Sequence, residues 1–270
     1  MILFPNCKIN LGLNILRKRP DGYHDIETVF YPVPFHDILE IIPASDGMFA
    51  FSKSGLMIPG DMEKNLCVRA YRLLSSDFPI PEVKMHLHKV IPMGAGLGGG
   101  SSDGAFTLLL LNRLFDLKLD ERTLMDYARK LGSDCPFFIR NQPAFASGRG
   151  DLFEPSPVSL AGWNLALVFP GIHAGTSEAY AMITPKLPSR SLKKLMTVPV
   201  SGWKGWVTND FETVMIREYP VIGQIRDQLY NQGAAFAAMT GSGSAVFGLF
   251  RESPVIANLP PGCFTSSCIL

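Results

Sequence analysis

A glycine-rich loop between an alternating segment and an apolar segment constrains this chain more than any other feature. After Pro92-Met93 the sequence runs Gly94-Ala95-Gly96-Leu97-Gly98-Gly99-Gly100-Ser101-Ser102, which holds five of the 25 glycines. Glycine tolerates positive φ and lets backbone N–H groups approach a ligand without a Cβ in the way. Residues 105–111 are almost all apolar and predict a buried helix whose N-terminus faces the loop. Exposed amides and the positive end of a helix dipole favour an anion such as phosphate.

Periodic patterns predict strands and helices in turn along the rest of the chain. Alternation predicts strands near residues 7–15 and 83–91, and runs of β-forming residues predict strands near 28–31 and 165–169 and a β-rich end at 236–250. Helical spacing predicts helices at 65–76, 120–131, 176–182 and 221–231. The first strand is expected to be half-buried, with Lys8 and Asn10 roughly 6.6 Å apart on its polar face. A Pro/Ser-rich stretch at 155–159 favours two α+β domains, residues 1–155 and 156–270.

Composition excludes several classes of function. The chain has 270 residues, 47% of them hydrophobic and 18% charged, with a formal net charge of +1. No overall field therefore attracts nucleic acid or an anionic membrane. Neither a signal peptide nor an apolar run long enough to cross a bilayer is evident, so we expect a cytoplasmic protein. The five cysteines are scattered without a metal-binding spacing, and we expect reduced thiols.

Three known glycine signatures fit the loop imperfectly. A P-loop needs a lysine where this chain has Gly100. The dinucleotide-binding pattern matches Gly94, Gly96 and Gly99, but its ribose-binding acid should end a strand, whereas Asp116 follows the predicted helix. The protein-kinase pattern needs downstream H-R-D and D-F-G sequences that this chain lacks. A flexible connector would not lie tightly between a strand and an apolar helix, so a phosphate site remains the interpretation.

An enzyme that phosphorylates a small alcohol needs a group to orient or deprotonate the hydroxyl, and an aspartate near a lysine suits this chemistry. Asp134 lies between a predicted helix end at Gly132 and Pro136, which fixes the local path of the chain. An N-cap role for Asp134 is equally consistent with this position. Lys8 is the candidate partner, but sequence spacing does not show that the two residues meet.

Several motifs together resemble the GHMP kinases, the family of galactokinase, homoserine kinase, mevalonate kinase and phosphomevalonate kinase. The glycine loop from Pro92 to Asp103 resembles the phosphate loop of that family. Further matching stretches are residues 8–11, 19–24, 131–138, 148–150, 209–212 and 240–244. Within the family the chain most resembles the branch that acts on 4-diphosphocytidyl-2-C-methyl-D-erythritol, because of Lys8-Ile9-Asn10-Leu11 followed by Arg19-Pro20-Asp21-Gly22-Tyr23-His24.

The resemblance implies a two-domain α+β GHMP kinase fold, with an N-terminal domain like domain 2 of ribosomal protein S5 and a ferredoxin-like C-terminal domain. It implies that Asp134 is the catalytic base and that Lys8 acts with it. Asn10 would place the polyol, Tyr23 and His24 would hold the cytosine, and Gly241, Ser242 and Gly243 would face the substrate diphosphate.

The resemblance also implies ATP with Mg²⁺. The implied ATP-binding residues are Asn65, Lys89, Pro92, Met93, Gly94, Ala95, Gly96, Leu97, Gly98, Gly99, Gly100, Ser101 and Ser102. Ser101 or Ser102 would contact Mg²⁺, without a dedicated protein cage.

The implied reaction is ATP-dependent phosphorylation of the substrate's 2-hydroxyl in the non-mevalonate route to isopentenyl diphosphate. The implied partner is this small molecule, with no nucleic acid and no membrane, and the protein would be a monomer or a weak homodimer. The alternatives are a GHMP kinase for mevalonate, phosphomevalonate or homoserine, a nucleotide-binding dehydrogenase, and a non-catalytic nucleotide-binding regulator.

The chain departs from the family pattern in three places. Cys7 and Cys135 replace small apolar residues beside Lys8 and Asp134. Gly104 replaces a usual alanine, an exchange that costs up to about 1 kcal/mol inside a helix. Three prolines follow Phe250, where the family usually has a helix.

Overall fold

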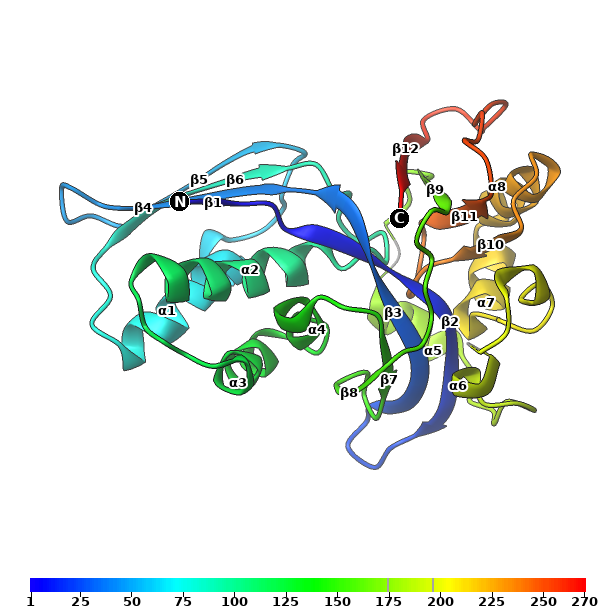
Figure 1. Ribbon diagram of the computed structural model, residues 1–270, viewed down its shortest axis with the longest axis horizontal. Coiled ribbons are helices and arrows are strands. Elements are labelled where there is room, and N and C mark those ends of the chain that lie inside the picture. The colour runs from blue at the N-terminus through cyan, green and yellow to red at the C-terminus, as the bar shows by residue number, and fades with distance from the viewer. Residues whose placement is uncertain (174, 196) are drawn as a thin grey trace. The chain divides into compact units, whose positions relative to one another are not determined.

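The computed structural model describes residues 1–173, 175–195 and 197–270 (Figure 1). Its contacts divide the chain into two compact units. Unit 1 consists of residues 1–7, 35–93 and 98–142, and unit 2 of residues 8–34, 94–97 and 143–270.

This division differs from the predicted boundary after residue 155 because of a long hairpin near the start of the chain. The hairpin strands are β2 (Asn6–Lys18) and β3 (His24–His36), joined through a turn at Pro20-Asp21-Gly22. They form a sheet with β7 (Ala144–Ser147) and β8 (Leu152–Pro155), in the order β2-β3-β7-β8. Most of the hairpin therefore belongs to unit 2, together with residues 143–270. The domain boundary after residue 155 remains a prediction.

Unit 1 is a sheet with helices packed against it. The sheet has the order β1-β4-β6-β5, formed by β1 (Ile2–Leu3), β4 (Ile38–Pro43), β5 (Ala50–Gly55) and β6 (Val83–Lys89). The helices are the 3-10 turn η1 (Met62–Lys64), α1 (Leu66–Asp77), α2 (Gly99–Leu114), α3 (Glu121–Leu131) and α4 (Cys135–Arg140). In Figure 1, α1 to α4 gather on one side of the sheet, and α2 contacts β1 and β4. Strand β6 alternates between buried and partly buried residues, as the sequence predicts.

Local signals place the helix ends. The Asn65 side chain accepts a 2.9 Å hydrogen bond from the backbone of Cys67 at the start of α1. Asp120 accepts a 2.8 Å bond from the backbone of Thr123 at the start of α3, where the sequence predicts a helix from residue 120. Helix α2 begins at Gly99, inside the glycine run and ahead of the serines predicted to open it. The positive end of this helix therefore lies in the loop itself.

Gly104 allows α1 and α2 to approach closely. A Cβ at this position would lie 2.9 Å from the Leu66 Cβ. We expect Gly104→Ala to lower the free energy of unfolding by about 1–2 kcal/mol, because overpacking outweighs the helix propensity gained. Urea denaturation measures this change. Gly100→Ala is the control in the same helix, because a Cβ there would meet nothing within 4 Å. A Gly104→Ala protein as stable as the parent would contradict this account.

Unit 2 contains a second sheet with the order β10-β11-β9-β12. Its strands are β9 (Asn164–Phe169), β10 (Phe236–Met239), β11 (Val246–Phe250) and β12 (Phe264–Ile269), and all its pairings are antiparallel. The helical segments are α5 (Thr176–Met182), α6 (Leu192–Leu195), η2 (Val200–Gly202), α7 (Asp210–Glu218) and α8 (Pro220–Asn231). This strand order is that of a ferredoxin-like sheet. Residues 251–263, all of them described, contain no helix, as the prolines there favour.

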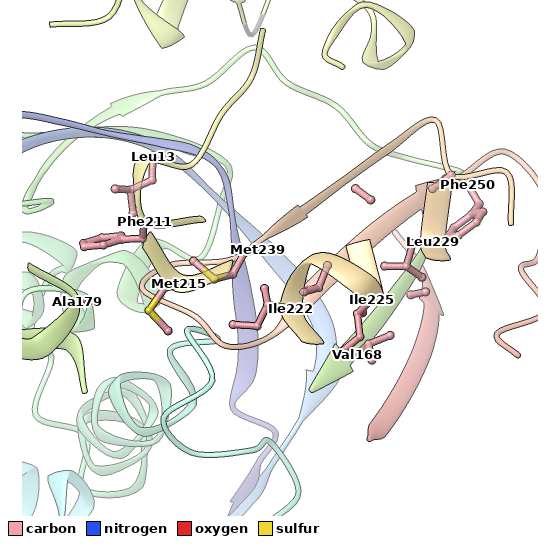
Figure 2. Close-up of a cluster of buried hydrophobic side chains, with 14 of the residues drawn as sticks. Leu13, Val168, Ala179, Phe211, Met215, Ile222, Ile225, Leu229, Met239 and Phe250 are labelled. Atoms are coloured by element: carbon pink, nitrogen blue, oxygen red, sulfur yellow. The ribbon is translucent and has the colours of Figure 1, made fainter. Parts of the chain in front are cut away.

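The core of unit 2 lies between this sheet and its helices (Figure 2). Phe211 and Met215 enter it from α7, and Ile222, Ile225 and Leu229 enter it from α8. Helix α8 packs against β10 and β11. Leu13 of β2 joins the same cluster, which ties the early hairpin to the later elements of this unit.

Strand β2 is buried on both faces from Asn6 to Ile15, so the prediction of a half-buried strand is wrong. Its polar side chains are nearly inaccessible, with exposed fractions of 3% for Lys8 and 2% for Asn10. Buried polar groups require partners, and protein atoms supply them here, as the site shows. The alternation in β2 therefore reflects one apolar face and one polar face, both of which are buried.

Candidate active site

The glycine loop adopts conformations that other residues rarely reach. Gly94, Gly96 and Gly98 have φ values of 65°, 77° and 71°. A Cβ on Gly96 would lie 2.1 Å from the carbonyl oxygen of Thr240. Gly98 forms the N-cap of α2 without a side chain. The loop therefore needs glycine for its turns and for the close approach of another backbone.

That second backbone belongs to the other glycine-rich motif of the chain. The Ala245 N–H donates to the Ala95 carbonyl at 3.1 Å, and the Thr240 hydroxyl lies 3.3 Å from the Gly96 carbonyl. Residues 240–245 connect β10 and β11, within the predicted β-rich end at 236–250. Asn209 holds this turn, because its Nδ2 donates to the carbonyls of Met239 and Gly241 at 2.9 and 2.8 Å. Unit 2 therefore brings part of the predicted ATP loop beside the predicted substrate turn.

Lys8 points to the same place from β2. Its Nζ donates to the Gly96 carbonyl at 2.8 Å and to Asn10 Oδ1 at 2.5 Å. The Lys8 N–H donates to the Leu97 carbonyl at 2.9 Å. The Asn10 Nδ2 donates to the Thr28 hydroxyl at 2.8 Å, and the Asn10 N–H donates to the Thr240 hydroxyl at 2.9 Å. A buried ammonium is thus held against the loop backbone by groups that fix its direction.

Ser242, in the middle of that turn, has a defined partner. Its hydroxyl lies 3.1 Å from the hydroxyl of Thr176, the first residue of α5. Gly241 and Gly243 flank it with φ values of 58° and 91°. The turn therefore presents small residues and backbone amides.

Asp134 lies at the start of α4 in unit 1. It occupies the N-cap position with φ −82° and ψ −17°, but the described structure has no capping hydrogen bond from its side chain. The next residues, Cys135 and Pro136, are buried. The capping role that the sequence left open is therefore not filled by this carboxylate. Lys8 belongs to unit 2, and its pairing with Asp134 remains a prediction.

A cavity of about 260 Å³ lies within unit 1. Its walls include the predicted ATP-binding residues Asn65, Lys89, Met93 and Gly100, and the remaining walls are Phe51, Lys53, Ile58, Pro59, Gly60, Asp61, Met62, Lys64, Leu66 and Asp103. Residues from β5, β6, η1, α1 and α2 thus converge on one apolar space beside the start of α2. A cavity of this kind suits a flat apolar group with a few polar contacts.

The Lys89 side chain at this cavity is engaged by two aspartates that the sequence gave no reason to pair with it. Lys89 Nζ donates to Asp37 and to Asp103 Oδ2, the latter at 2.8 Å. Asp37 Oδ1 also accepts from the backbone N–H groups of Val90 and Ile91 at 2.6 and 2.8 Å. Burial raises the pKa of Asp103 to about 7, against the opposing effect of the Lys89 charge. The cluster fixes the end of β6 to the first turn of α2.

Tyr23 and His24 lie at the hairpin turn of unit 2. Tyr23 is 58% exposed, and the Arg149 guanidinium lies 5.0 Å from the centre of its ring. His24 stacks on Tyr180 of α5, with ring centres 4.8 Å apart and planes inclined by 18°. Burial, followed by the nearby Lys18 charge, lowers the pKa of His24. The lowered pKa favours the neutral imidazole, which can both donate and accept a hydrogen bond. Tyr180 carried no sequence signal beyond its place in a predicted helix.

Residues that could contact a metal ion are few. Among residues 1–173, 175–195 and 197–270, no group of three or more His, Cys, Asp or Glu side chains is placed to hold one. Ser102 Oγ is buried and has no hydrogen-bond partner among the described groups. The Ser101 hydroxyl bonds to the Cys135 thiol, whose pKa burial raises to about 12. This donor set suits a cation that is already coordinated by a polyphosphate.

The sequence patterns of known families match both halves of the chain. Residues 65–149 match the GHMP kinases N terminal domain, and residues 192–259 match GHMP kinases C terminal. The chain belongs to the GHMP kinase family. Membership of a kinase family implies ATP as phosphate donor and, for this fold, a small-molecule acceptor. It also confirms the predicted two-domain α+β fold.

Individual GHMP kinases resemble this chain over nearly their whole length. It is 52% identical to 4-diphosphocytidyl-2-C-methyl-D-erythritol kinase of Bacteroides fragilis over 96% of this chain and 95% of the relative. Identity with the kinase of that name from Cytophaga hutchinsonii is 51%, covering 94% of each. A crystal structure of 4-(cytidine 5'-diphospho)-2C-methyl-D-erythritol kinase aligns at 32% identity and a TM-score of 0.75, covering 92% of this chain and 90% of the other.

More distant GHMP kinases share the fold alone. Methanococcus jannaschii mevalonate kinase aligns with a TM-score of 0.66 at 14% identity, over 100% of this chain and 98% of the other.

The dehydrogenase alternative fails on the position of its required acid, since Asp116 follows α2 and its side chain is 82% exposed. None of the helices in the described ranges is long and apolar enough to span a membrane.

Proposed function

We propose that this chain transfers the γ-phosphoryl group of ATP to the 2-hydroxyl of 4-diphosphocytidyl-2-C-methyl-D-erythritol, in the non-mevalonate route to isopentenyl diphosphate. The observation that carries this proposal is 52% identity, over nearly the full length, with the Bacteroides fragilis kinase named for that substrate. The element from Arg19 to His24 supports it, because kinases for other small alcohols have no use for a cytosine-binding hairpin turn.

The nucleotide would bind at the cavity of unit 1 and at the glycine loop. Asn65, Lys89, Met93 and Gly100 line the cavity, which suits the base of ATP. The amides of the loop and the start of α2 would hold the phosphates. The full proposed set is Asn65, Lys89, Pro92, Met93, Gly94, Ala95, Gly96, Leu97, Gly98, Gly99, Gly100, Ser101 and Ser102.

Mg²⁺ would arrive with the nucleotide and, when bound, neutralise charge on the phosphoryl oxygens. Ser101 is the residue we assign to it, because this residue is only partly buried. Ser102 Oγ is sealed from solvent and would reach the ion only if the first turn of α2 opened.

Catalysis would depend on Asp134 and Lys8. Asp134 would accept the proton of the attacking hydroxyl, and the Lys8 ammonium would orient that hydroxyl and stabilise developing negative charge. The bonds from Lys8 to Gly96 and Asn10 support this role, because they hold the ammonium beside the loop that receives the phosphates. Asn10 would place the polyol.

The rest of the substrate would bind in unit 2. Tyr23 offers an exposed ring for stacking on the cytosine, and neutral His24 offers a donor and an acceptor. The backbone amides of Gly241, Ser242 and Gly243 would face the diphosphate. We further propose that the protein is cytoplasmic and a monomer or a weak homodimer.

An ATP-consumption assay tests the substrate assignment. The protein is offered the cytidyl-methylerythritol substrate, mevalonate, phosphomevalonate and homoserine at equal concentrations, and ADP release is measured. We expect selective turnover of the first. Turnover of one of the other alcohols would replace this assignment with the corresponding GHMP kinase, and ATP binding without turnover of any would favour a regulator.

A further inference from the structure

Two asparagine side chains pair with each other in unit 1, at the ends of the elements that carry Lys8 and Asp134. Asn6 begins β2, two residues before Lys8, and Asn141 follows the last residue of α4. Asn6 Nδ2 donates to Asn141 Oδ1 at 3.1 Å, and Asn141 Nδ2 donates back to Asn6 Oδ1 at 2.7 Å. The two amides therefore form a reciprocal pair, 135 residues apart in sequence.

The pair is a rigid connection. Asn6 is 5% exposed, and its second amide hydrogen bonds to the Cys7 carbonyl at 2.8 Å. Both of its donor hydrogens and its acceptor are thus used. Asn141 has left-handed backbone angles, φ 55° and ψ 44°, and its N–H caps α4 at the Phe137 carbonyl at 2.8 Å. Since both backbones are fixed, neither amide can turn without breaking the pair.

Helix α4 transmits the position of Asn141 to Asp134. It has six residues, of which Cys135 to Ile139 are buried. So short a helix, roughly 9 Å at 1.5 Å per residue, moves as one piece. The attachment at its C-terminal end therefore helps to set where its first residues lie.

We propose that the Asn6–Asn141 pair is a positioning element for catalysis, which fixes α4, and with it Asp134, to the first residue of β2 within unit 1. This inference rests on the proposed roles of Asp134 and Lys8. A displacement of about 1 Å at reacting groups can lower a rate by about 10²-fold. Neither asparagine lines the cavity of unit 1, so we expect ATP binding there not to depend on the pair.

The test is a double-mutant cycle with Asn6→Ala, Asn141→Gly and both together. Glycine at position 141 tolerates the left-handed backbone and removes the side chain that makes the pair. We expect each single variant to lower kcat at least about tenfold and to change the KM for ATP less than about twofold. The double variant should be no slower than the slower single variant, because one broken partner already removes the pair.

Asn112→Ala is the matched control. Its partly buried amide also makes a reciprocal clamp, donating to the Leu119 carbonyl at 3.1 Å and accepting from the Leu119 N–H at 3.0 Å. This clamp joins the last turn of α2 to the segment that follows it, and it includes no residue of α4. We expect a similar fall in Tm with an unchanged kcat. An equal loss of kcat in this control, additive effects in the cycle, or an unchanged kcat in either single variant would overturn the proposal.

Backbone amide hydrogen exchange in α4 provides a measurement that needs no turnover. Asn6→Ala and Asn141→Gly should speed exchange at Phe138 and Ile139, whereas Asn112→Ala should not. Unchanged exchange in α4 would also overturn the positioning role. If the parent protein does not turn over the cytidyl substrate, the proposed function fails by that result alone, and the exchange data still decide whether the pair holds α4.

Discussion

Asp134→Asn is expected to lower kcat for phosphoryl transfer roughly 10²–10⁴-fold, the usual contribution of a general base. Asparagine has nearly the same shape as aspartate but cannot accept the proton of the attacking hydroxyl. The nucleotide cavity and the glycine loop do not include Asp134, so the KM for ATP should change by less than about twofold. Steady-state kinetics with the cytidyl-methylerythritol substrate and binding of a non-hydrolysable ATP analogue measure the two quantities.

This substitution also separates catalysis from helix capping. Asparagine caps helices about as well as aspartate, so a residue that served only as an N-cap would tolerate the change in both rate and stability. Asp120→Asn is the matched control, since Asp120 caps α3 through its bond from Thr123. We expect that variant to keep the parental kcat and Tm. Near-normal turnover in Asp134→Asn would remove this carboxylate from the mechanism.

The parts of the fold that follow from local chemistry could be predicted from the sequence. Asn65 and Asp120 occupy positions where a side-chain oxygen can accept from a nearby helical N–H, and such a bond depends on residues two or three places apart. The turn between β10 and β11 also follows from local chemistry, because Gly241 and Gly243 tolerate the positive φ that the turn requires. The resemblance to the GHMP kinases then predicted the fold in which these elements are arranged.

The environment of β2 could not be predicted from alternation. A polar face predicts solvent contact only when no other part of the chain covers it. Lys8, Asn10 and Thr240 make bonds to one another across 230 residues of sequence, and no local pattern encodes such partners. Stacking of His24 on Tyr180 of α5 was missed for the same reason.

The same limit applies to the charge cluster at the nucleotide cavity. Lys89 was assigned to the nucleotide region from motif position, and it does line the cavity there. Its ammonium, however, binds Asp37 and Asp103, which lie 52 and 14 residues away. Only the contact between the end of β6 and the start of α2 brings these charges together. The sequence therefore identified where Lys89 lies but not what its charge does.

Lys89→Met is expected to lower the free energy of unfolding at pH 7 by about 3–5 kcal/mol, the usual effect of breaking a buried ion pair from one side. Lys89 and Asp37 are 1% and 0% exposed, and Asp103 is nearly as buried. Without the ammonium, two buried carboxyls remain with no cation between them. Urea denaturation measures the loss. Lys84→Met is the control on the same strand, because its pair with Asp46 is 40% exposed on both sides and should contribute at most about 1 kcal/mol.

The pH dependence of that loss tests whether unpaired buried carboxylates cause it. Burial already raises the pKa of Asp103 from 3.8 to about 7, and removal of Lys89 takes away the charge that opposes this rise. A carboxyl whose folded pKa exceeds its unfolded pKa contributes stability below the unfolded value, and this contribution is lost as the pH rises through the folded value. The parent should therefore lose some stability between about pH 4 and pH 7, whereas the Lys89→Met protein should lose more and continue to lose it at higher pH. The loss of free energy of unfolding in the Lys89→Met protein, relative to the parent, should therefore be smaller at pH 5 than at pH 8. At pH 5 protonated carboxyls can hydrogen-bond to each other without a cation. A deficit independent of pH would mean that unpaired carboxylates do not cause the loss, and the charge cluster would then not be what fixes the start of α2.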